Sequence, residues 1–171
     1  MKKIAIILIS LLFLSSGFKV DIDTVSKMRA VFIMSFAKGI EWPPAYQKGN
    51  FVVGVVGNSP LYNELIKMAK IKKVANQSLE IKKYTAVDDI AKCHILYVSE
   101  NKTKEIANVV SKVKPNSTLI ITAEPGLAEK GSGINFIVKN YRTAYEINKK
   151  NVEKHKLKLR SNIEKLAFEV K

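Results

Sequence analysis

Residues 28–43 read MRAVFIMSFAKGIEWP, a dense apolar run that ends in an acidic residue, the only tryptophan and a proline. Only Ser35 is polar between residues 30 and 37, so a helix with a single buried stripe does not account for this run. The apolar residues recur at helical spacing and a glycine follows them, which predicts a helix over about residues 24–38. We expect other elements to cover this helix on several sides.

The residues after this helix predict a rigid corner. A residue that precedes proline is pushed out of the α conformation, so Trp42 should leave the helix in an extended conformation, held by Pro43 and Pro44. An aromatic residue in this position suits the centre of a protein interface. We therefore take Glu41, Trp42 and Pro43 as candidate partner-binding residues and expect Glu41 and Trp42 to be exposed. Core packing of the whole run is the alternative interpretation.

Length and composition indicate one globular domain. The chain has 171 residues, of which 47% are hydrophobic and 26% are charged. This balance is typical of a folded protein rather than of a disordered chain. We assign the domain to residues 21–171.

The first residues have the pattern of a secretory signal peptide. A basic start at residues 1–3 precedes the apolar residues 4–14, and small residues follow at 15–17. A membrane span needs about 20 apolar residues, and Lys19 ends this run too early. We expect cleavage near Gly17 and an exported protein, with an uncleaved anchor as the alternative.

The chain is strongly basic. Its net charge is +14, and removal of residues 1–17, which hold two lysines and no acidic residue, lowers it to +12. An exported protein of this charge can meet anionic lipid headgroups, acidic polymers or an acidic protein partner. The alternative is that lysine is simply the common surface residue. We expect no nucleic-acid binding, because arginine appears only at positions 29, 142 and 160.

Alternating strand and helix patterns predict an α/β fold with a mostly parallel sheet of about five to six strands and helices on both faces. The expected elements after the corner are a strand at 51–57, a helix from about Pro60, one or two strands within 71–84, a strand at 93–98, a helix at 102–112 and a strand at 118–122. Lysines within 71–84 suggest that one of those strands lies at an edge.

The last third of the chain departs from this alternation. Two apolar runs at 133–138 and 143–147 are separated by four residues, which predicts an antiparallel hairpin at one edge of the sheet. We name Asn135 and Glu146 in this hairpin as further candidate partner-binding residues, with a hydrogen bond that steadies the hairpin as the alternative. From about Lys149 the spacing is helical as far as Val170, with a break near Leu157.

Nothing in the sequence predicts catalysis, a metal or a cofactor. The two histidines, His94 in a buried-type strand and His155 in a lysine-rich helix, have no acid or thiol at a metal-binding spacing. No nucleophile motif occurs. Cys93 is the only cysteine, so it is either buried and inert or joins two chains, and its apolar surroundings favour burial.

Six blocks of sequence, taken in order, resemble the YfiR family. They are the helix end and corner at 36–43, VGVVGNSP at 53–60, CHILYV at 93–98, GINF at 133–136, EIN at 146–148 and LKLRS at 157–161. The resemblance covers about residues 26–170.

This resemblance implies an exported, non-catalytic regulator of a membrane signalling partner. The family's named member is a periplasmic repressor of an inner-membrane diguanylate cyclase, the enzyme that makes cyclic-di-GMP, and related domains occur beside sensor histidine kinases. A homodimer is also implied. The strand cysteine of the family matches Cys93, but no second cysteine exists here. Redox control by an internal disulfide therefore cannot operate in this chain.

A different function is a periplasmic small-ligand binding protein. Ligands of open α/β sheets bind beyond the carboxyl ends of the strands. In this chain those ends include Asn58, Ser99 and Thr122.

Overall fold

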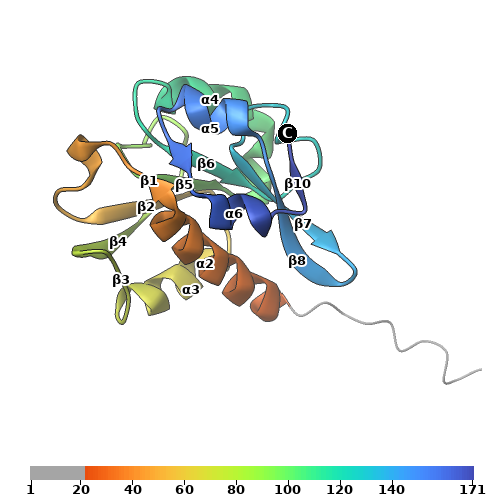
Figure 1. Ribbon diagram of the computed structural model, residues 1–171, viewed down its shortest axis with the longest axis horizontal. Helices are drawn as coiled ribbons and strands as arrows, with labels where there is room; N and C mark the ends of the chain where they lie inside the picture. Colours follow the sequence, from red (N-terminus) through yellow and green to blue (C-terminus); the bar gives the residue numbers. More distant parts are fainter. Residues whose placement is uncertain (1–21) are drawn as a thin grey trace, which may run out of the picture.

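The computed structural model describes residues 22–171, so the predicted signal peptide lies outside the described residues. In the part of the chain that it describes, no helix is both long enough and apolar enough to span a bilayer. A sheet lies between helices α2 and α3 on one side and α4 on the other (Figure 1).

The sheet has eight strands in the order β10-β8-β7-β6-β5-β2-β4-β3. Strands β4, β2, β5, β6 and β7 run parallel to one another, and β7 and β8 form the predicted antiparallel hairpin. The α/β, mostly parallel prediction is therefore confirmed. The bounds are β2 (Phe51–Val56), β3 (Lys73–Val74), β4 (Gln77–Tyr84), β5 (Ile95–Val98), β6 (Leu119–Thr122), β7 (Ile134–Lys139), β8 (Arg142–Ile147) and β10 (Glu169–Val170).

Two short strands extend the sheet beyond the predicted number. The two-residue β3 pairs with β4 and forms one edge, where the lysine-rich segment was expected. The two-residue β10 pairs in parallel with β8 and forms the other edge, outside the hairpin. Five of the six longer strands follow the predicted apolar runs, and the sixth, β4, lies in segment 71–84, where one or two strands were predicted.

Five α-helices occur within residues 22–171, and they cover both faces of the sheet. Ile33 and Phe36 of α2 and Leu65 of α3 belong to the core cluster on one face, whereas Val109 and Val113 of α4 belong to the cluster on the other. The helices are α2 (Ile22–Gly39), α3 (Leu61–Ala69), α4 (Ile106–Val113), α5 (Lys149–Lys154) and α6 (Ser161–Lys165), with 3₁₀-helices η2 (Pro44–Tyr46) and η3 (Glu100–Glu105).

Helix α2 confirms the prediction of a helix over 24–38, but it is not covered all round. Ala30, Ile33 and Ala37 are buried, whereas Met28 and Val31 are exposed. Residues three apart on a helix share a face. The side that carries Met28 and Val31 therefore faces solvent, and the expectation of cover on several sides is wrong for that side.

The end of the chain breaks into short elements near Leu157, as predicted, but it does not stay helical as far as Val170. Helices α5 and α6 are separated by β9 (Lys158–Leu159), which pairs with β1 (Ile40–Glu41). The helical prediction for the last residues is wrong because their backbone pairs with β8. The N–H of Phe168 donates to the carbonyl of Tyr145, and that of Lys171 donates to the carbonyl of Ile147.

Candidate functional site

Trp42 lies inside the corner, and its predicted exposure is wrong. Its side chain is among the buried residues, with 9% of the residue exposed. Its indole N–H donates to the carbonyl of Ala37 at 2.9 Å, and its ring meets Phe51 edge-on at 5.3 Å between centroids. The last carbonyls of a helix have no partner within the helix, so the indole group satisfies one of them. Glu41 is exposed, as expected, and Pro43 is half-buried.

His94 completes this aromatic corner as a neutral side chain. Its Nδ1 accepts from the N–H of Val52 at 3.0 Å, and its Nε2 lies 2.7 Å from the carbonyl oxygen of Tyr46, to which it donates. Its ring stacks on Phe51 at 4.1 Å between centroids. Burial lowers the pKa of His94. With both nitrogens in use, the ring supports the fold and is not available as an acid or base.

A groove of about 700 Å³ opens over the corner, between the end of α2 and the turn from β3 to β4; we call it the corner groove. Glu41, Trp42 and Arg160 line it. Its other lining residues are Ala37, Lys38, Ile40, Gln47, Val74, Ala75, Asn76 and Gln77. Its accessible groups are thus mainly polar and charged, because the aromatic surface of Trp42 is used by the core.

Asn135 and Glu146 face each other across the hairpin and belong to a buried polar chain. Thr122 Oγ1 donates to Asn135 Oδ1 at 2.6 Å, and Asn135 Nδ2 donates to Glu146 Oε1 at 2.8 Å. The ammonium group of Lys171 lies 3.0 Å from Glu146 Oε2. The hydrogen bond that steadies the hairpin is therefore present, and Asn135 is fully buried. A direct contact of either residue with a partner stays a prediction.

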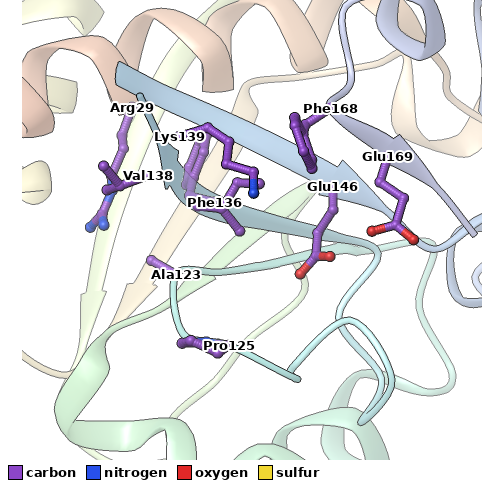
Figure 2. Close-up of a pocket in the computed structure, with 10 residues that line it drawn as sticks. Arg29, Ala123, Pro125, Phe136, Val138, Lys139, Glu146, Phe168 and Glu169 are labelled. Atoms are coloured by element: carbon purple, nitrogen blue, oxygen red, sulfur yellow. The ribbon is translucent and has the colours of Figure 1, made fainter. Parts of the chain in front are cut away.

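A second groove, of about 470 Å³, lies on the hairpin; we call it the hairpin groove (Figure 2). Glu146, Phe168 and Val138 line this groove. Phe168 is 54% exposed and Val138 is 57% exposed. The Nζ atom of Lys139 lies 4.7 Å from the centroid of the Phe168 ring. The remaining lining residues are Arg29, Ala123, Pro125, Phe136, Ile137 and Glu169.

Arg29 brings a cation from α2 to the hairpin groove. Its Nη1 donates to Tyr97 Oη at 3.0 Å and to Glu100 Oε1 at 2.8 Å. Its guanidinium carbon lies 5.8 Å from the centroid of the Phe136 ring. Its Nε atom is buried and has no hydrogen-bond partner within the described residues. The groove therefore combines aromatic surface with positive charge at one end and a carboxylate at the other.

The remaining reactive side chains are buried or bonded to the backbone. His155 Nδ1 lies 3.1 Å from the carbonyl oxygen of Asn116. Cys93 is buried, as expected, and burial raises the pKa of its thiol to about 12. Within residues 22–171, no group of three or more His, Cys, Asp or Glu side chains is placed to hold a metal ion.

The strand ends named for the small-ligand hypothesis do not converge on either groove. Ser99 and Thr122 are fully buried, and Asn58 is exposed on a different part of the surface from both groove linings. Only Ala123, the residue after Thr122, reaches the hairpin groove.

Comparison with models of protein families assigns the chain to one family. The family model DUF4154, described as YfiR/HmsC-like, matches residues 26–168, which is most of the sequence, so the chain belongs to this family. This match confirms the resemblance to the YfiR family that the six sequence blocks indicate. A comparison with curated proteins found no match.

Solved structures share the fold at low sequence identity. A conserved domain protein from Vibrio cholerae O1 biovar El Tor strain N16961 has a TM-score of 0.62 at 13% identity, over 85% of this chain. The ABC domain from Streptococcus pneumonia in complex with L-Trp has a TM-score of 0.58 at 12% identity, over 86% of this chain. This chain spans 60% of the length of each.

Proposed function

We propose that this protein is an exported regulator that binds the periplasmic part of an inner-membrane diguanylate cyclase through its hairpin groove. Family membership supports the class of partner. The observation that carries the choice of surface is the exposure of Phe168 and Val138 in a groove where the buried Asn135 and Glu146 are already hydrogen-bonded to each other. A partner that covers this pair therefore leaves neither residue without a hydrogen bond.

The groove has the composition of an interface centre. Aromatic and arginine side chains dominate the binding energy of protein interfaces, and the exposed Phe168 and the half-buried Arg29 line this groove. Phe136 also lines it but is buried. Lys139 already lies over the Phe168 ring. A partner segment with an apolar anchor and an acidic residue fits this arrangement.

Regulation requires that the protein binds one state of the cyclase more tightly than the other, because a protein with equal affinity for both states does not change the equilibrium between them. Glu41, which lines the corner groove, and the half-buried Pro43 near it in the chain form a second candidate contact for the same partner. Trp42 and Asn135 act indirectly, since both are buried and hold these surfaces in place.

A cross-linking experiment in cells tests the proposal. A photo-reactive amino acid at position 168 should capture a membrane diguanylate cyclase, and the same amino acid at position 31 should not. Val31 is a suitable control because it is also an exposed apolar residue but does not line the groove. Capture of a sensor histidine kinase would change the class of partner. Capture of a second copy of this chain would make the groove a homodimer interface.

The readout in the cell is the concentration of cyclic-di-GMP. Phe168→Ser should change it in the same direction as deletion of the protein, whereas Val31→Ser should leave it at the wild-type value. The proposal is wrong if deletion alters neither the cyclic-di-GMP concentration nor the output of a sensor kinase and position 168 captures no membrane protein.

A small-ligand function is the second candidate. The hairpin groove is within the size range of ligand pockets, about 300–1,000 Å³, and the buried Nε of Arg29 lacks a partner within the described residues. Bound ligand raises apparent stability. A thermal-shift screen at millimolar concentrations should therefore find a stabiliser whose effect disappears in Arg29→Lys, and a screen without one contradicts this function.

A further inference from the structure

The turn from α3 to β3 displays an apolar side chain between cations. Ile71 is 77% exposed, and Lys70, Lys72 and Lys73 on either side of it are also exposed. Within residues 22–171, none of these three lysines takes part in a salt bridge. The turn is thus a patch of positive charge with one aliphatic residue at its centre.

Protection of a sheet edge explains only part of this pattern. Strand β3 is the outermost strand at its side of the sheet, and lysines at an edge prevent pairing with other chains. That role accounts for Lys72 and Lys73. It does not account for Ile71, because an exposed aliphatic residue beside an open edge favours the association that the lysines oppose.

We propose that this turn docks on an anionic lipid surface, with Ile71 inserted at the headgroup level and the three lysines beside the headgroup phosphates. Basic residues gain attraction from an anionic membrane surface, and one inserted apolar side chain adds to it. One aliphatic side chain offers too little area for the buried centre of a protein interface. The pattern therefore favours lipid over an acidic protein.

The docked orientation leaves the hairpin groove accessible. The turn lies at the β3 edge of the sheet, and the β7–β8 hairpin lies near the opposite edge (Figure 1). The same molecule can therefore contact lipid through one edge and a protein through the other. This inference does not depend on the identity of the protein partner.

A fluorescent label at position 71 tests the proposal. Cys93 is buried, and its high pKa keeps the thiol protonated, so a thiol-reactive dye will label Ile71→Cys selectively. The chain is exported and purified from the periplasm, then labelled with a polarity-sensitive dye. Vesicles that contain phosphatidylglycerol should shift the emission to shorter wavelength, and vesicles of phosphatidylcholine alone should not. About 1 M salt should abolish the shift, because it screens charges beyond about 3 Å.

Two matched variants localise the effect. The same dye on Ser111→Cys, an exposed position on α4 at the other face of the sheet, should show no shift. Lys72→Glu with Lys73→Glu, added to labelled Ile71→Cys, should weaken vesicle binding at least about tenfold. Circular dichroism checks that these variants fold.

Three results overturn the proposal. They are no emission shift at position 71 with anionic vesicles, an equal shift with phosphatidylcholine, and an equal shift with polyglutamate in the absence of lipid. The last result would assign the patch to an acidic protein.

Discussion

At the corner, Trp42 is buried, and its indole N–H, like both nitrogens of the neighbouring His94, is bonded to the backbone. At the hairpin groove, Phe168 is exposed, with the ammonium group of Lys139 over its ring and its backbone N–H bonded to Tyr145 of β8. Both regions carry aromatic residues. From the sequence, the tryptophan at the corner was the more obvious candidate for a contact with a partner. The structure buries Trp42 and leaves Phe168 exposed, which supports the hairpin groove as the proposed contact surface.

The two regions differ in whether a backbone polar group depends on the aromatic side chain for its hydrogen bond. The carbonyl of Ala37 takes the indole N–H of Trp42, so this ring is held inward. At the hairpin, Asn135 and Glu146 are hydrogen-bonded to each other. The Phe168 ring, which has no hydrogen-bonding group, is not held inward by a bond of this kind. We therefore expect substitutions at the corner to change stability and substitutions at the hairpin groove to change partner binding.

The largest effect should follow from Trp42→Ala. Loss of a buried aromatic side chain from a packed core costs about 3–5 kcal/mol of unfolding free energy, which urea unfolding will measure. Trp42→Phe, which keeps a ring and removes the N–H donor to Ala37, should cost about 1–2 kcal/mol. The comparison fails if Trp42→Phe folds stably and abolishes partner capture, since Trp42 would then act as a contact residue.

Glu146→Ala should have the next largest effect. It leaves Asn135 Nδ2 buried without an acceptor and removes a partner of Lys171, which should lower the unfolding free energy by about 2–3 kcal/mol. Glu169 pairs with the same lysine but is exposed, so Glu169→Ala should stay within about 0.5 kcal/mol of wild type. Equal losses in the two variants would show that the buried polar chain does not stabilise the hairpin.

Mild acid should weaken the corner before the hairpin. Burial lowers the pKa of His94 from its usual 6.5, so the folded state binds fewer protons than the unfolded state below that pH. The stability that neutral His94 contributes is complete above about pH 6.5 and is lost as the pH falls, by at most about 1.4 kcal/mol per pH unit. Lys92, which faces the ring from its own segment, strengthens the effect, and the other titratable neighbour is the Tyr46 phenol.

Urea unfolding at pH 7.5 and 5.5 measures this loss. His94→Gln should start less stable but show a smaller change between the two pH values. An unchanged pH dependence in His94→Gln would assign the acid sensitivity to another part of the molecule.

The smallest change in stability should come from Phe168→Ser. The ring is more than half exposed, and substitutions at such surface positions usually stay within about 0.5 kcal/mol. Partner capture should nevertheless fall at least about tenfold, since one buried aromatic anchor supplies more than that factor in an interface. A large loss of stability with normal partner capture would remove the distinction between the two regions.

The sequence predicts the layers of this fold well because they follow from local patterns. The apolar runs at 51–57, 93–98 and 118–122 give the buried strands β2, β5 and β6, since strands covered on both faces are apolar throughout. The two runs at 133–138 and 143–147 give the hairpin for the same local reason.

The candidate site could be predicted only in part, because exposure depends on contacts distant in sequence. The hydrogen bond between Trp42 and Ala37 cannot be read from a tryptophan before two prolines. Phe168 lies in a segment that the sequence predicts as helical, but its backbone pairs with Tyr145 on β8, and this pairing has no local signal. Glu146, predicted as a partner-binding residue, is a paired, buried carboxylate in the fold, and its contact with a partner stays a prediction.

The short helix η2 has a practical consequence for protein engineering. The carbonyl of Tyr46 accepts hydrogen bonds from the side chains of His94 and Gln77, and its hydroxyl accepts one from the N–H of Ser117. Three segments that are distant in sequence are therefore hydrogen-bonded to this one turn. A peptide tag or a deletion there would disconnect all three at once. The hairpin tip at Asn140, which is exposed and has a positive φ, is the better place to insert a tag or open the chain for circular permutation.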